Sequence, residues 1–255
     1  MTLVTRYHNF RAKLFRVAKD VADILVPPTC LSCDQFVAKP GGCCPQCWSQ
    51  LRFVTEPLCP VLGTPFSVDM GGGILSAEAI ADPPPFDRLR TVVIYDDLPQ
   101  RLVASLKYGD RTDIVPWIAN WMSMAGKELI HDADIVVPIP LHRARLRTRR
   151  FNQSAELSRY IAKLNNKAYL PDLLFRKRNT RQQVGLTEAA RERNVSGAFH
   201  VPEEKKAVIQ GKRILLVDDV YTTGATIKAA VRALKRVKSS KIDVLVFAKV
   251  ETHLE

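Results

Sequence analysis

The chain has 255 residues, 46% of them hydrophobic, which is enough for one sizeable α/β domain plus a small accessory module and excludes disorder as the default interpretation. Its formal net charge of +12 favours an anionic partner, but phosphate-rich small molecules, nucleic acids and anionic membranes all satisfy that condition. No stretch approaches the roughly eighteen uncharged apolar residues of a membrane span, and residues 1–30 lack a signal-peptide pattern, so we expect a cytoplasmic protein without a membrane span.

The first 28 residues are expected to form an amphipathic N-terminal helix. Between residues 5 and 25, apolar side chains recur at near-helical spacing, with arginines and lysines among them. Such a face is more often packed against the rest of a protein than laid on a membrane or on nucleic acid, and we favour packing for that reason. Pro27 and Pro28 then end the helix.

All six cysteines lie in one segment, residues 29–62, which predicts a zinc-binding module. In a cytoplasmic chain, such clustering favours metal ligands over disulfides. Two C-x₂-C pairs separated by ten residues have the spacing of a structural tetrathiolate site, and the repeated spacing argues against free buried cysteines. Cys43 adjoins one of these cysteines and is a less well spaced alternative to it. The predicted ligands are Cys30, Cys33, Cys44 and Cys47.

A linker and then an α/β domain follow the cysteine module. Residues 63–90 carry a glycine triplet and a proline triplet, which mark a domain boundary, and the domain itself covers residues 91–255. Its strands are buried as continuous apolar runs separated by helices, which indicates a parallel sheet covered on both faces. The predicted strands are 92–95, 135–139, 214–217 and 242–247, and the predicted helices are 98–107, 112–130, 152–164 and 224–237.

Two adjacent carboxylates, Asp218 and Asp219, end the predicted strand 214–217. A buried acidic pair is costly without a cationic or hydroxylated partner, so a partner is expected there. The next residues lead into a helix, and open parallel sheets bind their ligands at this edge, where strands end and helices begin. The loop consists of Thr222, Thr223, Gly224, Ala225 and Thr226.

This loop is suited to a phosphate monoester. Its backbone N–H groups converge, the helix dipole adds partial positive charge, and three threonine hydroxyls are further donors. Gly224 lets the backbone approach a ligand without a Cβ. Asp218 and Asp219 are placed to accept hydrogen bonds from ribose 2- and 3-hydroxyl groups, directly or through Mg²⁺. The alternative is an ordinary helix N-cap with solvated aspartates, but it does not explain why acids, hydroxyls and glycine share one register.

The register from Ile214 to Thr226 closely resembles the signature of the type I phosphoribosyltransferases. The resemblance implies use of 5-phosphoribosyl 1-pyrophosphate with Mg²⁺, ribose contacts from Asp218 and Asp219, and 5-phosphate contacts from residues 222–226. Members that salvage 6-oxopurines usually carry an acidic residue where this chain has Thr222, so salvage of hypoxanthine or guanine is disfavoured.

Two arginine-rich segments are candidate pyrophosphate contacts. The first, residues 141–153, is expected to be a loop, and the second, residues 176–186, is interpreted as a mobile lid. The planar fork of arginine suits phosphate oxygens and neutralises the charge of a departing pyrophosphate. A nucleic-acid patch and an exposed linker are the respective alternatives. The candidate pyrophosphate residues are Lys107, His142, Arg143, Arg150, Arg178 and Arg181.

The whole assembly resembles the ComF family, also called the GntX-type family. The resemblance covers nearly the entire chain and rests on the Pro-Pro-x-Cys start at Pro27, on Phe151-Asn-Gln, on Thr180-Arg-Gln-Gln and on the phosphoribosyl loop. Family members are similar to amidophosphoribosyltransferases that carry an N-terminal zinc ribbon, and some are linked to natural competence. Of a second cysteine pair common in the family, only Cys59 remains here, with Leu62 at the position of its partner.

Two functions follow from these patterns. The first is a Mg²⁺-dependent phosphoribosyltransferase of nucleotide metabolism, which uses an unidentified nitrogen nucleophile. The second is a competence accessory protein that contacts single-stranded DNA or a helicase, with a phosphoribosyl site that senses a nucleotide precursor or is vestigial. The basic charge favours the second function. However, aromatic residues are only 7% of the chain and are not interleaved with the arginines, as a stacking platform for single strands requires.

Overall fold

The computed structural model describes residues 27–39, 41–69, 71–178 and 188–251, and the chain divides into two compact units. The units are Met1–Gln50 and Leu51–Glu255. Residues 51–62, which the sequence analysis assigned to the cysteine module, therefore belong to the second unit. The predicted helix over residues 5–25 lies outside the described residues. Among the residues that the structure describes, no helix has the length and apolar character needed to cross a membrane.

The described part of the first unit is short and contains little regular structure. A β-bridge joins Thr29 to Phe36, and the helix α2 (Pro45–Trp48) follows. Proline at the first position of α2 is favourable, because its fixed φ suits a helix start and its missing N–H would have no helical partner there. This segment is too small to form an apolar core of its own.

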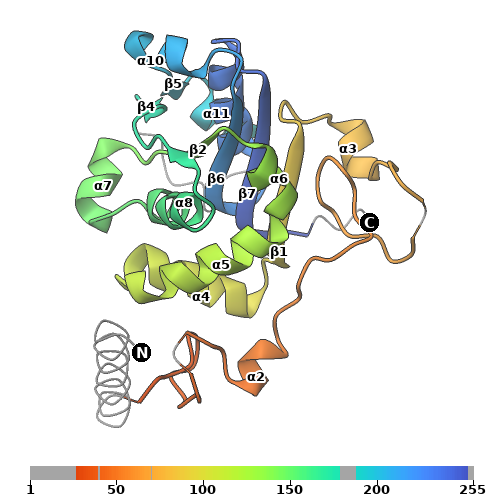
Figure 1. Cartoon of the computed structure of the whole chain (residues 1–255), viewed down its shortest axis with the longest axis vertical. Coiled ribbons are helices and arrows are strands. Elements are labelled where there is room, and N and C mark those ends of the chain that lie inside the picture. Colours follow the sequence, from red (N-terminus) through yellow and green to blue (C-terminus); the bar gives the residue numbers. More distant parts are fainter. Residues whose placement is uncertain (1–26, 40, 70, 179–187, 252–255) are drawn as a thin grey trace, which may run out of the picture. The chain divides into compact units, whose positions relative to one another are not determined.

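The second unit is built on a five-stranded parallel sheet in the order β1-β7-β6-β2-β3 (Figure 1). The central strands β6 and β7 are buried almost throughout, as expected for a sheet covered on both faces, and the predicted α/β fold is confirmed. A small antiparallel sheet pairs β4 with β5. The strands are β1 (Arg88–Ile94), β2 (Ile135–Pro138), β3 (Ala168–Tyr169), β4 (Phe175–Arg176), β5 (Phe199–His200), β6 (Arg213–Tyr221) and β7 (Lys241–Lys249).

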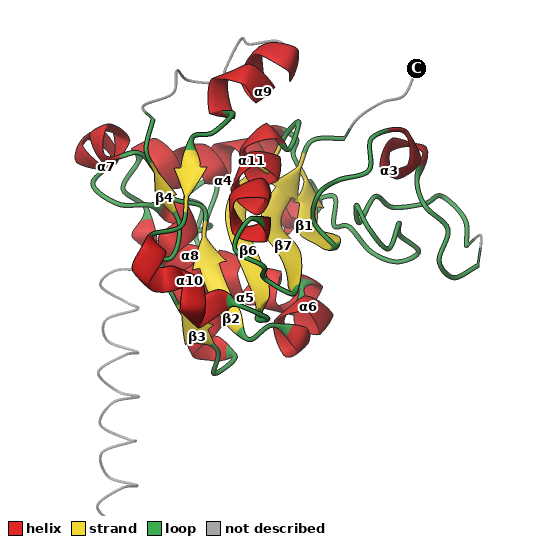
Figure 2. Cartoon of the chain, turned by 90° about the horizontal axis from the view of Figure 1, so that it is seen from above, coloured by secondary structure: helices red, strands yellow, loops and turns green. Residues whose placement is uncertain are grey.

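Helices cover both faces of the sheet (Figure 2). They are α3 (Ala77–Ala81), α4 (Asp97–Tyr108), the 3₁₀ helix η1 (Thr112–Ile114), α5 (Val115–Ala125), α6 (Lys127–Asp132), α7 (Arg143–Arg149), α8 (Gln153–Leu164), α9 (Glu188–Val195), α10 (Glu203–Ile209) and α11 (Ala225–Lys235). The single helix predicted over 112–130 is thus three elements. The last break falls at Gly126, where a Cβ would lie only 2.7 Å from a methyl group of Leu245.

The connections of the sheet place the helices and define its switch point. The chain crosses the sheet in one direction from β1 to β2 and from β2 to β3, but in the opposite direction from β6 to β7. Because parallel crossovers are right-handed, α5 and α8 lie together on one face, whereas α11 packs with α9 and β5 on the other. The order of the strands therefore reverses between β2 and β6, and the carboxyl ends of these two strands border the crevice where such sheets bind ligands.

A partly buried ion cluster connects the edge strand β1 to its neighbour β7. The guanidinium of Arg88 donates from Nε to Oδ1 of Asp243 at 3.0 Å and from Nη2 to Oδ2 of Asp243 at 2.6 Å. The same Nη2 donates to Oδ2 of Asp132 at 2.8 Å. Asp243 is only 4% exposed, so its charge depends on this arginine.

We expect Asp243→Ala to lower the free energy of unfolding by about 3 kcal/mol. The substitution removes the bidentate pair between Arg88 and the buried carboxylate, and it leaves the charge of Arg88 balanced by Asp132 alone within this cluster. Urea denaturation of the full chain measures this change. Asp113→Ala is the control, since it breaks the exposed ion pair with Arg111 and should cost less than about 1 kcal/mol. Equal losses in the two variants would contradict a structural role for the buried cluster.

Candidate functional site

A cavity of about 260 Å³ opens at the carboxyl ends of β6 and β2, where the strand order of the sheet reverses. Two helices begin beside it: α8, shortly after β2, and α11, directly after β6. The first N–H groups of a helix have no partner within the helix, so both helix starts offer donors to an anion. The polar or charged side chains that line it are Tyr95, Lys107, Tyr108, Arg145, Arg149, Gln153, Ser154, Arg176, Asp218, Asp219, Thr222 and Thr226.

The two predicted carboxylates both line this cavity and are held by different partners. Oδ1 of Asp218 accepts hydrogen bonds from the hydroxyl of Ser154 at 2.7 Å and from the backbone N–H of Asp219 at 3.0 Å. Oδ1 of Asp219 lies 3.1 Å from the ammonium of Lys107, at the end of α4. The costly acidic pair is thus matched by one hydroxyl and one cation, as the sequence analysis requires.

Burial, followed by the neighbouring charge of Asp219, raises the pKa of Asp218 to about 7, although the hydrogen bond from Ser154 opposes this shift. Burial alone would lower the pKa of Lys107, but the charge and hydrogen bond of Asp219, together with the charge of Asp218, outweigh burial and raise it. Asp218 therefore gains or loses a proton close to neutral pH, while Lys107 stays charged.

The loop after β6 turns sharply at Gly224, which has φ 72° and ψ 0° and precedes the first residue of α11. A Cβ at this position would come within 2.3 Å of the hydroxyl of Tyr221, so only glycine fits without displacing a buried ring. Thr222, Ala225 and Thr226 line the cavity together with this glycine. Thr223 is not among the lining residues, and its buried hydroxyl has no hydrogen-bond partner among the described residues.

The basic side chains that reach the cavity differ from most of those proposed from the sequence. Residues 141–153 are not simply a loop, because they contain α7, whose N-terminus is capped by Nδ1 of His142 accepting from the N–H of Ala144 at 3.2 Å. Arginine is a good helix former, which explains why this segment folds as a helix. Arg145 and Arg149, one helical turn apart, line the cavity.

The other candidate pyrophosphate residues lie elsewhere, except for Lys107. Arg143 is exposed, and Arg150 forms an ion pair with Asp110 at 2.8 Å. Arg178 donates to the carbonyl of Ser196 at 2.9 Å, whereas Arg181 lies outside the described residues. None of His142, Arg143, Arg150 and Arg178 is among the lining residues.

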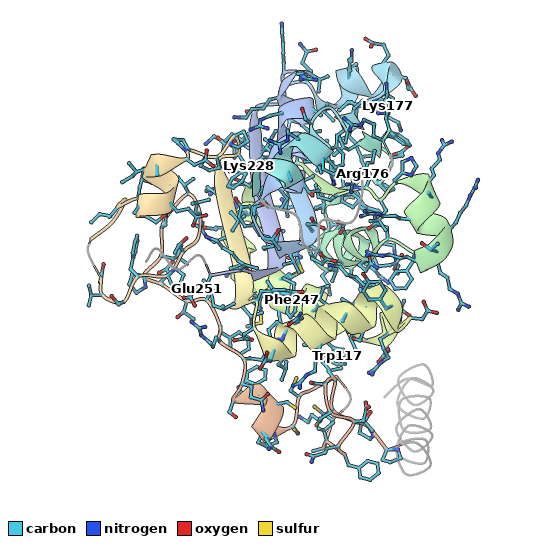
Figure 3. All side chains as sticks on the ribbon, turned by 180° about the vertical axis from the view of Figure 1, so that it is seen from behind. Trp117, Arg176, Lys177, Lys228, Phe247 and Glu251 are labelled. Atoms are coloured by element: carbon cyan, nitrogen blue, oxygen red, sulfur yellow. The ribbon has the colours of Figure 1, made fainter. Side chains whose placement is uncertain are left out.

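Arg176, labelled in Figure 3, reaches the cavity from β4 and was not proposed from the sequence. Its side chain is largely buried and stacks over the ring of Phe199, with 5.4 Å from Cζ to the ring centre. Burial and the nearby charge of Arg145 lower its pKa to about 10, so it stays protonated at neutral pH. A buried cation that faces a cavity is suited to an anionic ligand.

Two polar residues at the start of α8 were also missed. Gln153 is 1% exposed, lines the cavity, and its Nε2 has no hydrogen-bond partner among the described residues. Ser154 is the residue that bonds Asp218. A signal was present in the sequence, since the triplet Phe151-Asn-Gln lies at the start of the predicted helix 152–164.

The four predicted zinc ligands converge in the first unit. The sulfurs of Cys30, Cys33, Cys44 and Cys47 all lie within 4.8 Å of one another. Tetrahedral zinc with Zn–S bonds of about 2.3 Å requires sulfur pairs about 3.8 Å apart, so this cluster fits the metal. The Sγ of Cys30 accepts N–H groups of Ser32 at 3.5 Å and of Cys44 at 3.3 Å, which is the arrangement that favours a thiolate ligand.

The pKa values of neighbouring thiols distinguish a zinc ligand from a cysteine outside the metal cluster. Burial disfavours ionisation of Cys30, but backbone N–H groups, that of Cys44 foremost, outweigh burial and lower its pKa to about 6. Burial raises the pKa of Cys43 to about 12, and this cysteine is not part of the cluster. Cys44 rather than Cys43 therefore completes the tetrathiolate set.

Cys59 lies in the second unit and is fully buried. Its Sγ accepts the N–H groups of Leu62 at 3.5 Å and of Ser76 at 3.3 Å, a turn shaped like a metal knuckle. The ammonium of Lys249 is buried nearby and bonds the hydroxyl of Thr64 at 2.7 Å. Among the described residues, the tetrathiolate set is the one metal-type cluster of three or more ligands.

We expect one zinc ion per chain, and we expect Cys44→Ser to lose it, because three thiolates and a hydroxyl bind zinc weakly. Metal content of the purified full chain, measured by inductively coupled plasma mass spectrometry, tests this. Cys43→Ser is the matched control and should retain the metal. A result of two ions per chain, or zinc loss in the Cys43 variant instead, would contradict the assignment.

Comparison with known proteins agrees with both parts of the chain. The family model described as Double zinc ribbon domain matches residues 21–79, and that described as Phosphoribosyl transferase domain matches residues 156–254. The DNA utilization protein YhgH of Escherichia coli (strain K12) is 27% identical over 230 residues, which cover 87% of this chain and 96% of that protein.

The Competence protein ComFC of Bacillus subtilis (strain 168) is 30% identical over 220 residues, which cover 80% of this chain and 88% of that protein. The solved structure of the allosteric regulatory enzyme of purine biosynthesis is 20% identical with a TM-score of 0.38, over 56% of this chain but only 29% of that one. The relatives extend over most of the chain, zinc ribbon and phosphoribosyltransferase domain together, and the protein therefore belongs to the ComF family.

Proposed function

We propose that the chain binds 5-phosphoribosyl 1-pyrophosphate with Mg²⁺ and transfers the phosphoribosyl group to a nitrogen nucleophile. One observation carries this proposal: Asp218 and Asp219 face the same cavity as the hydroxyl-bearing start of α11, with basic side chains around them. A sugar phosphate has this distribution of groups, with hydroxyls for the carboxylates and anions for the donors and cations.

Each part of the ligand has a matching part of the cavity. The 5-phosphate would take the N–H groups at the start of α11 and the hydroxyls of Thr222 and Thr226. The ribose hydroxyls would donate to Asp218 and Asp219. The pyrophosphate would lie against the cationic side chains that line the cavity, which are Lys107, Arg145, Arg149 and Arg176.

The reaction depends mainly on positioning the ribose relative to the nucleophile and on neutralising the charge of the leaving pyrophosphate. The C1–O bond to pyrophosphate breaks, the sugar passes through an oxocarbenium-like state, and a nitrogen lone pair forms the new bond to C1. Mg²⁺, held by oxygens of the ligand itself, would neutralise part of the charge on the leaving group. The arginines would stabilise the same developing charge, while the carboxylates would keep the ribose fixed relative to the nucleophile.

The acceptor is not a 6-oxopurine in this proposal. Thr222 occupies the position at which phosphoribosyltransferases that salvage 6-oxopurines carry an acidic residue, and a hydroxyl does not take up the base proton as a carboxylate does. The nucleophile should therefore be an amine nitrogen, whose free lone pair needs no such help.

We expect Asp218→Asn with Asp219→Asn to weaken binding of the magnesium complex of 5-phosphoribosyl 1-pyrophosphate at least 100-fold, because two charged acceptors for ribose hydroxyls are lost. Isothermal titration calorimetry measures the affinity, with the exposed Asp113→Asn as the control. The same variants serve as controls when the protein is incubated with this ligand and a metabolite extract, and mass spectrometry is used to find a phosphoribosylated product. Unchanged affinity in the double variant would refute the assignment.

The fold should survive the change. The folded-state pKa of Asp218 is raised from 3.8 to about 7, so the folded protein binds more protons than the unfolded chain between these values. Stability from this group is thus lost as the pH rises through that window. Asparagine at position 218 removes this penalty, so Asp218→Asn by itself should be at least as stable as the parent protein above pH 7, whereas Asp219→Asn gives up the ion pair with Lys107.

A second function is favoured by the relatives, whose names refer to DNA utilization and competence. The outer side of α7 carries exposed Arg143 and Arg147, one turn apart, which are suited to a phosphodiester backbone. In this alternative, the protein holds single-stranded DNA and its phosphoribosyl site senses a nucleotide precursor.

If this second function holds, an unstructured oligonucleotide should bind with a strong salt dependence, and Arg143→Ala with Arg147→Ala should reduce the slope of log affinity against log salt by about 2. Fluorescence anisotropy at several salt concentrations measures the slope. Lys206→Ala, which removes an exposed ion-paired lysine on α10, should leave it unchanged. Absence of salt-dependent binding by the parent protein would exclude this function.

A further inference from the structure

Ser154 connects the two halves of the cavity. It occupies the second position of α8, which follows β2 and α7, yet its hydroxyl donates at 2.7 Å to Oδ1 of Asp218, in the carboxyl-terminal half of β6. The side chain is 4% exposed, so water does not compete for this hydrogen bond. The contact joins residues 64 positions apart in the chain and crosses the point at which the strand order reverses.

Both hydrogen bonds to Asp218 converge on the same oxygen. Oδ1 accepts from Ser154 and from the backbone N–H of Asp219 at 3.0 Å, which fixes the plane of the carboxylate. We infer that Ser154 is a positioning residue for Asp218, which holds Oδ1 so that Oδ2 is presented to a ribose hydroxyl. This inference rests on the proposed function.

The serine is itself held firmly, as a positioning residue must be. Its backbone N–H donates to Oδ1 of Asn152 at 3.1 Å, and Nδ2 of Asn152 donates to the carbonyl of Ile139, at the end of β2, at 3.0 Å. Its carbonyl accepts the hydroxyl of Ser158 at 2.6 Å. The start of α8 is thereby anchored to the end of β2, and the hydroxyl of Ser154 has a defined place against β6.

The contribution of Ser154 can be measured through the pKa of Asp218, which the surrounding groups raise or lower. Asp219 on β6 disfavours a second negative charge, whereas Lys107 on α4 and Arg176 on β4 favour it. Ser154 on α8 adds the neutral hydrogen bond that lowers the pKa of Asp218, against the larger effect of burial. Without this hydroxyl, the pKa of Asp218 would rise further above about 7, and more of the carboxyl would be protonated at neutral pH.

The test compares Ser154→Ala with Ser158→Ala in the full-length chain. Both changes remove a buried hydroxyl from the same helix, one turn apart, but only Ser154 contacts Asp218. Calorimetric titration with the magnesium complex of 5-phosphoribosyl 1-pyrophosphate is carried out between about pH 6 and pH 9. We expect Ser154→Ala to weaken binding about tenfold at pH 7 and to move the pH at which affinity is half-lost upward by about one unit. Ser158→Ala should leave this midpoint in place.

The outcomes separate the inference from the function on which it rests. If the parent protein binds the ligand and Ser154→Ala has the parental affinity and midpoint, the positioning role is refuted while the proposed function stands. Equal weakening in both serine variants without a change of midpoint would also refute it, because that result reflects only helix stability. If the parent protein fails to bind at every pH, the proposed function itself is wrong.

Discussion

Two adjacent carboxylates at the end of a buried strand are the constraint on which the site depends. A pair of negative charges in a poorly solvated place is unfavourable unless donors and cations surround it. The structure meets this need from three directions, with Ser154 on α8, Lys107 on α4 and Arg176 on β4. Each of these side chains belongs to a different segment, so the acidic pair organises the packing of elements that are distant in sequence.

The same place is the switch point of the sheet, and this gives the cavity two helix starts instead of one. The start of α11 carries the glycine and threonines suited to a phosphate, while the start of α8 carries an unpartnered glutamine amide and the serine that holds Asp218. Four cationic side chains, Lys107, Arg145, Arg149 and Arg176, line the same cavity. A ligand with a phosphate at each end and hydroxyls between them has the matching pattern of charge.

The segment that follows Cys59 is connected to the loop at Gly224 through two side chains, Lys249 and Tyr221. Lys249, buried at the end of β7, bonds the segment that follows Cys59 and lies over the ring of Tyr221 at 5.8 Å. That ring is the surface against which Gly224 turns. A turn shaped like a metal knuckle is thus contacted by an ammonium group, which also lies against the ring that supports the loop at Gly224. The four clustered cysteines and the cavity belong to different units of the chain.

The parallel α/β sheet, the tetrathiolate set, and the register of acids and hydroxyls from β6 into α11 could be predicted from the sequence, because each depends on spacing within a short segment. Buried strands are continuous apolar runs, and metal knuckles need fixed spacing. The basic groups that share the cavity with the acids became apparent only in the folded structure. Arg145 and Arg149 line the cavity, whereas Arg143 and Arg150 do not, because a helix presents different faces and its rotation depends on packing. The contact of Ser154 with Asp218 likewise depends on how α8 docks against β6, which no local pattern in the sequence specifies.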